Sequence, residues 1–346
     1  MSTTDTASNA AAPDEPSSDL SPGRRLRAQI PAPSAERPEV QQRDFPALSA
    51  DDTVYLIDGA AYIFRAYFAM FKAAQSRGQR FSRSDGLPTG AVMTFCNMLW
   101  KIVRDGIDGT PPSRIGVIFD HKDPTFRSEI YPEYKANREA PPDDLIPQFP
   151  LIRHAVRAFN LTPIEQPGYE ADDIIATYVE QAREAGAKIT IVSGDKDLMQ
   201  LIGPGVQMYD PMPGNERQID TAAVEKKFGV GPDRVVDVQA LAGDSTDNVP
   251  GVPGIGIKTA AQLIGEFGDL ETLLTQADTI KQKKRRENLI EFAEQARISR
   301  QLVELYRETP VEINVHALDI PAIDGPRLVA FSKAMEFRTF TNRVAQ

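Results

Sequence analysis

Three stretches of sequence decide the fold: VYLID (54–58), RIGVIFD (114–120) and KITIVSGD (188–195). Each is a short apolar run, rich in β-branched residues, that ends in an aspartate, as expected of a buried strand leading into a turn. Two helical patterns, 91–103 and 170–186, lie between these runs, so strand and helix alternate along the chain. This alternation predicts an α/β domain built on a mostly parallel sheet.

Acidic residues gather at the carboxyl ends of the predicted strands, where open α/β sheets bind their ligands. Further acids open the predicted helix after residue 169 and lie in GDSTDN (243–248). Any one of them could simply cap a helix or form a turn. Taken together, they predict a cleft lined by nine acidic side chains: Asp58, Asp120, Glu170, Asp172, Asp173, Asp195, Asp197, Asp244 and Asp247.

Carboxylates crowded into one cleft repel one another, and cations would neutralise that repulsion. Oxygen ligands without thiolate or imidazole favour Mg²⁺ or Mn²⁺ over zinc. The chain has one cysteine and three histidines, too few and too scattered for a disulfide or a zinc site. We therefore expect two Mg²⁺ or Mn²⁺ ions, the arrangement that serves phosphodiester hydrolysis, and no Ser/His/Asp catalytic set.

After residue 220 the sequence changes to helical patterns with short turns: 221–229, 232–243, 257–268 and a long polar helix from about 282 to 306. Gly229, Gly243 and Gly268 stand where C-terminal caps are expected. This part of the chain therefore predicts a helical subdomain that follows the sheet.

The sequence GVPGIGIKTA (251–260) lies between two of these helices and lacks the residue spacing of a Walker loop or a dinucleotide fingerprint. It predicts a helix-hairpin-helix that offers backbone N–H groups and a helix start to a nucleic-acid phosphate. The residues expected to contact DNA here are Gly254, Gly256, Lys258 and Thr259. A tight turn that binds nothing is the alternative.

Basic residues cluster in KQKKRR (281–286) and in the segment 122–138. The second cluster interleaves bases with aromatic residues, a combination that suits single-stranded nucleic acid, and we expect Lys122, Arg127 and Tyr134 to contact DNA. For 281–286, a solvated helix face is an open alternative. The formal net charge of −10 alone would argue against a nucleic-acid partner, but it averages the acidic cluster against these basic surfaces.

The composition, 41% hydrophobic and 25% charged, is typical of a globular protein. Residues 1–50 are rich in Ala, Ser, Pro and acids, and predict a disordered N-terminal arm. We expect the α/β core at residues 51–220 and the helical subdomain at 221–346. No apolar run reaches the roughly 20 residues that span a bilayer, and no secretory signal opens the chain, so we expect a cytoplasmic, nucleoid-associated protein with no membrane contact.

A series of motifs runs in order from about Val54 to Phe340: LIDG, FRAY, PTGA, FDHKDPTFR, YKANR, GYEADD, SGDKDLMQL, GDSTDNVPGVPGIGIKTA and EFRTF. By these motifs the chain closely resembles the 5′ nuclease (flap endonuclease-like) family, and within it the 5′–3′ exonuclease domain of bacterial DNA polymerase I. The resemblance implies a PIN-like core, a helical arch over the active site and a helix-hairpin-helix that holds duplex DNA. It also implies cleavage of 5′ flaps, nicks and RNA-primed duplexes during replication and repair.

The resemblance assigns roles to individual residues. The family's metal-binding acids fall on the nine acidic positions given above, and every one is occupied by an acid. Lys135 and Arg138 of the arch, with Arg65 after the first strand, would neutralise the scissile phosphate and guide the 5′ strand. A monovalent cation such as K⁺ is expected in the hairpin, near Val252, Ile255 and Ile257.

The chain stops soon after EFRTF, so we expect a stand-alone, monomeric nuclease that works with a separate DNA polymerase and a ligase. Two other classes of protein compete with this interpretation. A catalytically silent DNA-binding scaffold would have lost some of the acids, and a ribonuclease of the PIN class would lack residues 251–260. The sequence leaves open the preference for exonuclease or endonuclease cleavage, the physiological metal, and how the acids divide between two ions.

Overall fold

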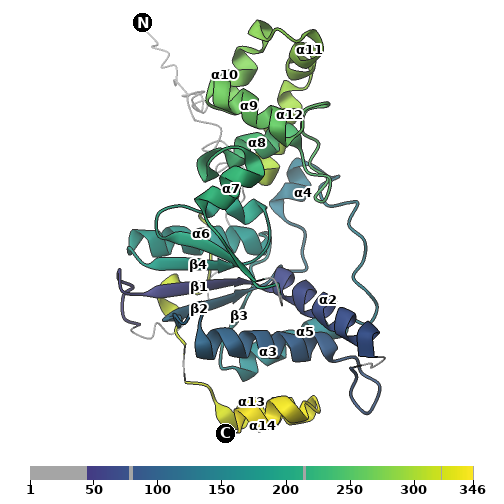
Figure 1. Ribbon diagram of the computed structural model, residues 1–346, viewed down its shortest axis with the longest axis vertical. Coiled ribbons are helices and arrows are strands. Elements are labelled where there is room, and N and C mark those ends of the chain that lie inside the picture. The colour runs from purple at the N-terminus through teal and green to yellow at the C-terminus, as the bar shows by residue number, and fades with distance from the viewer. Residues whose placement is uncertain (1–44, 78–80, 213–215, 321, 346) are drawn as a thin grey trace, which may run out of the picture. The chain divides into compact units, whose positions relative to one another are not determined.

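The structure is a computed structural model that describes residues 45–77, 81–212, 216–320 and 322–345 (Figure 1). The predicted disordered arm, residues 1–50, lies outside these ranges up to residue 44.

Within the described residues, the strands form one six-stranded sheet in the order β3-β2-β1-β4-β5-β6. The first five strands of this order pair in parallel, and β6 runs antiparallel to β5. The strands are β1 (Thr53–Asp58), β2 (Arg114–Ile118), β3 (Pro163–Ile164), β4 (Lys188–Val192), β5 (Val206–Asp210) and β6 (Arg217–Ile219). The three strands predicted from sequence are β1, β2 and β4, and they lie side by side at the centre of the sheet.

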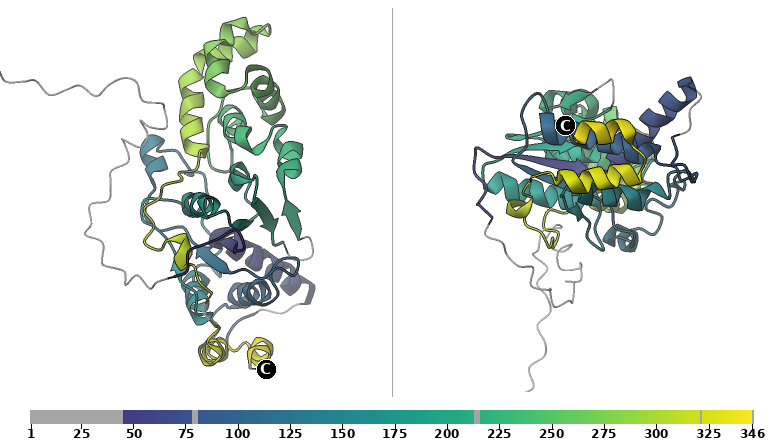
Figure 2. Two further views of the ribbon diagram at one scale, coloured as in Figure 1. Left: turned by 90° about the vertical axis from the view of Figure 1, so that its left-hand side faces the viewer. Right: turned by 90° about the horizontal axis from the view of Figure 1, so that it is seen from below.

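Helices cover both faces of the sheet, as Figures 1 and 2 show. Alternate residues of β1 point to opposite faces, so that Tyr55 and Ile57 join one core cluster and Val54 and Leu56 the other. The first cluster packs against α2 (Gly59–Arg77), α3 (Gly90–Asp105), α5 (Gln148–Ala158), α13 (Gly325–Ala334) and α14 (Arg338–Val344). The second packs against α6 (Ala171–Glu184) and continues into the helical subdomain. The predicted α/β architecture is therefore confirmed.

The helical subdomain follows the sheet in sequence and shares its core with the α6 face. Its helices are α7 (Thr221–Phe228), α8 (Val235–Ala242), α9 (Ile257–Phe267), α10 (Leu270–Thr275), α11 (Lys283–Glu291) and α12 (Ala293–Val303). Short 3-10 helices are η1 (Asp197–Leu201), η2 (Pro232–Arg234), η3 (Ala277–Thr279) and η4 (Val315–Ala317). Gly229, Gly243 and Gly268 follow α7, α8 and α9 with positive φ angles, which confirms them as C-terminal caps.

The single long helix predicted over 282–306 is wrong, because the chain forms α11 and α12 with a bend at Phe292 between them. Phe292 has φ −103° and ψ 21°, outside helical values, and its side chain packs against the core of the subdomain. Burial of this aromatic ring offers a reason for the bend that the polar sequence around it does not reveal.

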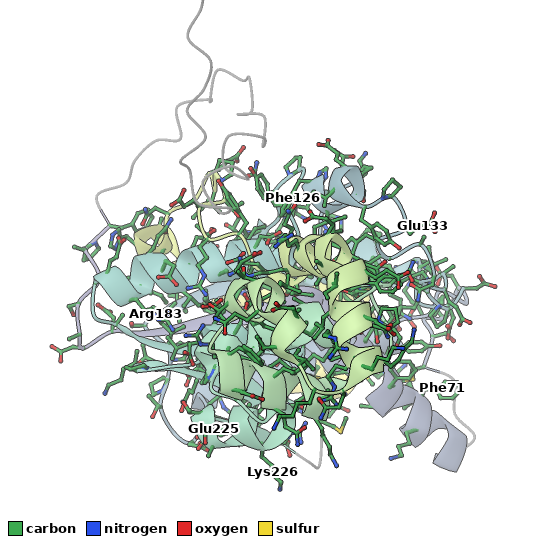
Figure 3. All side chains as sticks on the ribbon, turned by 90° about the horizontal axis from the view of Figure 1, so that it is seen from above. Phe71, Phe126, Glu133, Arg183, Glu225 and Lys226 are labelled. Atoms are coloured by element: carbon green, nitrogen blue, oxygen red, sulfur yellow. The ribbon has the colours of Figure 1, made fainter. Side chains whose placement is uncertain are left out.

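The segment between β2 and α5, predicted to arch over the active site, contains one short helix, α4 (Phe126–Ile130), followed by turns. Figure 3 shows Phe126 and Glu133 of this segment on one side of the helical subdomain, and Glu225 and Lys226 of α7 on the opposite side. None of the helices in the described part of the chain combines the length and the apolar character needed to cross a bilayer.

Candidate active site

The carboxyl ends of β1, β2 and β4 bring three of the predicted acids to one edge of the sheet. The chain leaves β1 toward β2 on one side and returns to β4 on the other, so the direction of winding switches between β1 and β4. Asp58 is the last residue of β1, Asp120 follows β2, and Asp195 follows β4. The sheet topology therefore explains why side chains far apart in sequence meet here.

Asp58 is buried at this edge and held by two donors. The hydroxyl of Ser193 donates to its Oδ2 at 2.7 Å, and the backbone N–H of Ala61 donates to its Oδ1 at 3.0 Å. Burial raises the pKa of Asp58 to about 7, and the charges of Asp195 and Asp120 add to the effect, although the two hydrogen bonds oppose it. Asp58 therefore lies in a buried environment that it shares with other acids.

The first turn of α6 supplies the next group of acids. Glu170 and Asp173 form a reciprocal capping box, and the N–H of Ala171 donates to Asp120 Oδ1 at 2.9 Å, which ties the helix start to the end of β2. Asp172 lies between them, and burial raises its pKa well above the usual range, reinforced by Asp195, Asp58 and Asp120. Carboxylates from four separate segments thus act on one another at this point.

A second group of acids surrounds the start of η1. Asp195 Oδ1 accepts the N–H of Asp197 at 3.0 Å, and burial together with Asp195 raises the pKa of Asp197 to about 7. Lys196 donates to Asp244, and Gln239 of α8 donates to Asp197. Asp244 therefore joins this group from the helical subdomain, through Lys196.

Two basic residues of the arch segment pair with acids of the site. Lys135 Nζ lies 2.7 Å from Glu170 Oε1 and 3.6 Å from Asp247 Oδ2, and Arg138 Nη2 lies 2.6 Å from Asp247 Oδ1. Burial would raise the pKa of Asp247, but Lys135 and Arg138 outweigh it and hold that pKa below the usual value. Both bases thus stand beside the acids, and their predicted role at the scissile phosphate stays a prediction.

Arg127 corrects a prediction, because it is buried rather than exposed to DNA. Only 1% of the residue is accessible, and its guanidinium forms bonds of 2.7 and 2.8 Å to the two carboxylate oxygens of Asp173. It also donates to the carbonyls of Leu302 and Glu304. A guanidinium enclosed in this way is a structural anchor between α4, α6 and the C-terminal end of α12.

Asp173 is consequently engaged on both oxygens. Besides Arg127, it accepts the backbone N–H groups of Glu170 and Tyr306 at 3.1 and 2.8 Å. This arrangement differs from the metal-ligand role predicted for it, since four donors already satisfy the carboxylate. Tyr134 is also buried, and its hydroxyl reaches Glu170 and Asp247, so in this structure its ring does not offer a stacking surface for bases.

Arg65 and Lys122 lie at the rim of the site. Arg65 of α2 is about a third exposed and sits 3.4 Å from the buried Asp210 of β5. Lys122 is exposed just after Asp120. Their predicted roles in DNA contact remain predictions.

The hairpin between α8 and α9 has the backbone that its glycines suggest. Gly254 has φ +77°, a conformation that favours glycine, whereas Gly256 has φ −97° and is the N-cap of α9. Gly254, Gly256 and Lys258 are exposed, and Thr259 is half-buried. Of the residues expected near a monovalent cation, Val252 and Ile255 have buried side chains and Ile257 an exposed one, so any cation there would meet backbone carbonyls.

The acids of the site are not gathered around a single cation position. In the described residues, no three acidic, histidine or cysteine side chains close around one point. Several of these carboxylates instead contact Lys135, Arg138, Lys196 and Arg127. The chemistry nevertheless fits, because the donors are carboxylate oxygens. Burial and neighbouring acids raise the pKa values of Asp58, Asp172 and Asp197, and a cation would offset the repulsion among these acids.

Sequence reasoning missed three residues that hold the acids in place: Ser193, Lys196 and Gln239. Ser193 bridges the ends of β1 and β4, since its hydroxyl donates to Asp58 and accepts the N–H of Asp195 at 3.0 Å. Ser193 and Lys196 stand inside the motif SGDKD, so their position next to the acids could have indicated them. No local signal in the sequence marks Gln239.

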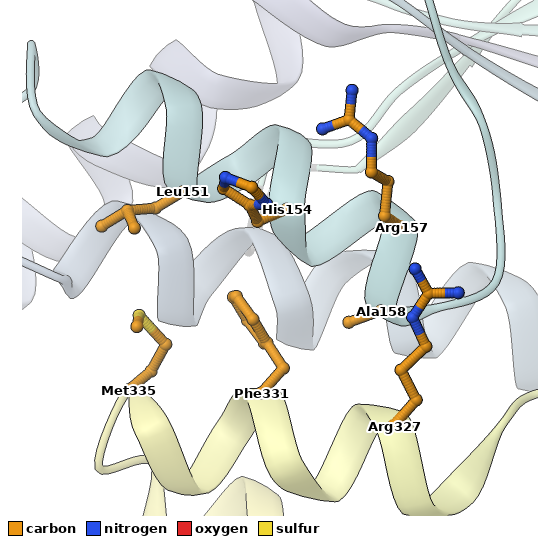
Figure 4. Close-up of a pocket in the computed structure, with 7 residues that line it drawn as sticks. All are labelled: Leu151, His154, Arg157, Ala158, Arg327, Phe331 and Met335. Atoms are coloured by element: carbon orange, nitrogen blue, oxygen red, sulfur yellow. The ribbon is translucent and has the colours of Figure 1, made fainter.

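A separate pocket lies between α5 and α13, with a volume of about 320 Å³ (Figure 4). His154 and Arg157 line it from α5, and Arg327, Phe331 and Met335 from α13. Its lining contains no acidic residue and belongs to the face of the sheet that packs against α5. It is therefore distinct from the carboxylate cluster.

Two protein-family models match the chain. One, described as the 5′–3′ exonuclease N-terminal resolvase-like domain, matches residues 53–229, and the other, the 5′–3′ exonuclease C-terminal SAM fold, matches residues 230–325. Together they cover the sheet and most of the helical subdomain.

Curated relatives that match the chain are DNA polymerases I. The enzyme of Rhizobium leguminosarum is 52% identical over 298 residues, which are 85% of this chain and 28% of the relative. That of Bacillus caldotenax is 36% identical over 291 residues, 84% of this chain and 32% of the relative. The chain thus spans less than a third of the length of these relatives.

Solved structures share the fold at lower identity. The T5 D15 protein, co-crystallised with metal ions, has a TM-score of 0.59 and 21% identity, and the match covers 85% of this chain and 100% of that chain. The catalytic core of Rad2 in complex with a DNA substrate has a TM-score of 0.53 and 17% identity, covering 83% and 88%. These likenesses support a PIN-like, resolvase-like core followed by a helical subdomain.

Proposed function

Because this chain belongs to the 5′–3′ exonuclease family, we propose that it is a divalent-cation-dependent 5′ nuclease of DNA replication and repair. Its substrates are 5′ ends, 5′ flaps, nicks and RNA-primed duplexes. The observation that carries the proposal is the placement of Asp58, Asp120 and Asp195 at the carboxyl ends of the central strands beside Asp172 in the first turn of α6. Ser193 joins Asp58 to Asp195, and the N–H of Ala171 joins the start of α6 to Asp120. Carboxylates gathered at this edge would bind cations, and the cations would in turn bind a phosphate.

The proposed cations are Mg²⁺ or Mn²⁺, with Asp120, Glu170 and Asp172 around one position and Asp195, Asp197, Asp244 and Asp247 holding or tuning the other. Asp58 interacts with Asp120 of the first group and with Asp195 of the second, and Asp173 bonds Arg127 instead of a cation. Two such ions would supply an activated water and stabilise charge on the phosphate. The T5 D15 structure, which was co-crystallised with metal ions, supports a role for metal ions.

The basic residues of the site bind and orient the DNA. Lys135 and Arg138 now neutralise Glu170 and Asp247. They would turn to the scissile phosphate once cations satisfy those carboxylates, and Arg65 would guide the 5′ strand. Hydrolysis forms a bond from water oxygen to phosphorus and breaks the phosphorus–O3′ bond, which leaves a 5′-phosphate and a 3′-hydroxyl.

The helix-hairpin-helix would hold the duplex through backbone N–H groups at Gly254 and Gly256, with Lys258 and Thr259 at the start of α9. A K⁺ ion at the hairpin carbonyls near Val252, Ile255 and Ile257 would strengthen the phosphate contact. Relatives named DNA polymerase I support a functional link to a polymerase, and a nick with a 5′-phosphate and a 3′-hydroxyl is what a ligase requires.

The test uses purified chain with labelled flap, nicked and RNA-primed duplexes, in Mg²⁺ and in Mn²⁺. We expect the 5′ arm to be released near the junction of single and double strands, with a 5′-phosphate on one product. A blunt duplex serves as the reference substrate for exonuclease cleavage. Failure to cut a flap that the protein demonstrably binds would overturn the proposal.

The raised pKa values predict a pH-dependent stability of the ion-free protein. Asp58 and Asp197 have pKa values of about 7 in the folded protein against 3.8 ordinarily, so the folded state holds protons that the unfolded state has lost. The contribution of these two carboxyls to stability is therefore fully present below their unfolded pKa and is lost as the pH rises through about 7. With chelator present, we expect Tm at pH 8 to lie on the order of 5 °C below Tm at pH 6.

Addition of Mg²⁺ at pH 8 should recover this loss, because ions that bind the folded state stabilise it. Asp58→Asn should flatten the pH dependence, since it removes one of the two carboxylates. Thermal unfolding followed by circular dichroism measures each effect. Equal Tm values at pH 6 and pH 8, with or without Mg²⁺, would contradict the proposed crowding of ionised carboxylates.

For Gly256→Ala we expect a loss of DNA affinity with at most a small loss of stability, since alanine caps a helix less well than glycine. A Cβ at Gly256 would meet no atom within 4 Å, and its φ of −97° suits any residue. The methyl group would nonetheless stand between a phosphate and the backbone N–H groups, so we expect duplex affinity to fall by about tenfold or more, as for a lost charged hydrogen bond. Fluorescence anisotropy in Ca²⁺ measures the affinity.

Gly265→Ala provides the matched control, because this glycine of α9 also has open space around its Cβ position. It should leave affinity unchanged and stabilise the helix by roughly 0.5–1 kcal/mol. If Gly256→Ala and Gly265→Ala bind duplex equally well, the hairpin is a tight turn with no phosphate contact.

A further inference from the structure

The basic run KQKKRR forms the approach to α11 and its first turn. Lys281, Lys283 and Lys284 are exposed, and Arg285 and Arg286 are half-buried. Among the described side chains, the ion pair recorded for this run is a loose one, from Lys283 to Glu287 at 3.9 Å. The charges of Lys281, Lys284 and Arg285 therefore have no acidic partner in the described residues.

The position of these charges is unfavourable for the helix itself. The N-terminal end of a helix carries partial positive charge, so basic residues there are repelled, typically by a few tenths of a kcal/mol up to about 1 kcal/mol each. The first turn of α11 contains no acid that could offset this. Neighbouring bases also repel one another. An anion bound at this end of α11 would reverse both effects.

Side chains of α11 and α12 hold this turn against the hairpin. Asn288 Nδ2 donates to the carbonyl of Pro253 at 2.7 Å, and Gln295 Nε2 donates to that of Gly251 at 2.7 Å. The N–H of Gly251 in turn donates to the hydroxyl of Ser299 at 2.9 Å. Asn288 is itself buried, so α11 is fixed to the backbone of the hairpin instead of hanging free in solvent.

Helical spacing then places the bases next to the exposed glycines. Lys284 and Arg285 lie four and three residues before Asn288, so all three share one face of α11, with neighbouring Cβ atoms roughly 5–6 Å apart. Asn288 Nδ2 lies 3.8 Å from the position of a Cβ on Gly254. The bases of α11 therefore stand about one helical turn from the hairpin surface.

We propose that the basic turn of α11 is a second duplex-binding element that contacts DNA phosphates beside those held by the hairpin. Lys281, Lys284 and Arg285 make the contacts, which are to backbone phosphates and so carry no sequence preference. In Figure 1, α11 lies at the end of the helical subdomain that is remote from the sheet. The contact therefore falls on duplex far from the cut, and a short duplex arm does not reach it.

This inference rests on the proposed function, since it requires that the hairpin binds duplex DNA. The test combines Lys281→Ala, Lys284→Ala and Arg285→Ala in one variant and measures duplex binding in Ca²⁺ over a range of salt. Log K falls as log salt rises, and each lost phosphate contact makes this slope shallower by about 0.9. We expect the slope of the variant to be shallower by about 2 to 3, and its affinity at low salt to be roughly 10- to 100-fold weaker.

Two comparisons make the result specific. A variant with Arg157→Ala, Lys188→Ala and Lys333→Ala removes the same charge from exposed positions of α5, β4 and α13, and should bind like the unaltered protein. Both variants are compared on two substrates. One has a duplex arm of about two helical turns, and the other has an arm of about half a turn. The α11 variant should lose affinity for the long arm and keep it for the short one.

Equal losses for the two variants would show that net charge alone matters and would overturn the inference. Equal losses on long and short arms would do the same, because the contact would then lie near the cut. Binding in Ca²⁺ is read without cleavage, so a protein that binds the long arm as expected and fails to cut in Mg²⁺ would refute the proposed function alone.

Discussion

Replacing Asp172 by asparagine is expected to abolish cleavage while flap binding persists. Asp172 lies where Asp195, Asp58 and Asp120 act on one carboxylate together, so its charge is central to any cation that binds there. Asparagine keeps the shape of the side chain and removes the charge. Loss of several kcal/mol of transition-state stabilisation corresponds to a fall in cleavage rate of about 10²- to 10³-fold or more.

Single-turnover cleavage of a labelled flap in Mg²⁺ measures the rate, and anisotropy in Ca²⁺ measures binding. Asp105→Asn is the control, since Asp105 is an exposed acid that ends α3 and precedes β2, at the opposite end of that strand from Asp120. The control should cleave normally. Because burial disfavours the charged form of Asp172, the asparagine variant should also be at least as stable as the unaltered protein in chelator. Undiminished cleavage by Asp172→Asn would show that the active site lies elsewhere.

Replacing Arg127 by methionine is expected to lower the free energy of unfolding by about 3–5 kcal/mol, as is typical when one partner of a buried ion pair is removed. The substitution leaves Asp173 buried with an uncompensated charge, since Arg127 contributes two bonds to it and is 1% exposed. It also removes the donors to the carbonyls of Leu302 and Glu304. Urea denaturation measures the change.

Arg153→Met is the matched control, because Arg153 pairs with Glu165 at 2.9 Å near the surface, where such pairs contribute about 0–1 kcal/mol. Adding Asp173→Asn to Arg127→Met should restore part of the lost stability, because the unpaired charge is then gone. A variant at Arg127 that is no less stable than the one at Arg153 would mean that the guanidinium is free, as expected of a DNA contact.

The central strands and their acids could be predicted because the signal is local. Each of β1, β2 and β4 is an apolar run that stops at or just before an aspartate, and parallel strands bring their carboxyl ends to one edge. The glycine caps of α7, α8 and α9 were predictable for the same reason. The short strands β3 and β6, with two and three residues, carry too little pattern to be recognised.

Contacts between residues that are distant in the chain could not be predicted from the sequence. Arg127 and Tyr134 belong to a segment of interleaved bases and aromatic residues, which predicts a nucleic-acid surface. In the structure both are buried, Arg127 beside Asp173 and Tyr134 beside Glu170. Gln239 of α8, in the helical subdomain, donates to Asp197, which follows β4. Phe292 separates α11 from α12, although the polar residues around it predict one continuous helix. Burial of a charged side chain depends on its partner, which no local pattern specifies.

The most direct test of the central claim, that the carboxylates at the ends of β1, β2 and β4 form a 5′ nuclease site, is the product analysis of a flap duplex labelled at its 5′ end. With Mg²⁺ present, we expect release of the labelled arm by a cut near the junction, which leaves a 5′-phosphate on the remaining duplex, and no release with chelator. A flap that is bound, as judged in Ca²⁺, and stays intact in both Mg²⁺ and Mn²⁺ would contradict it.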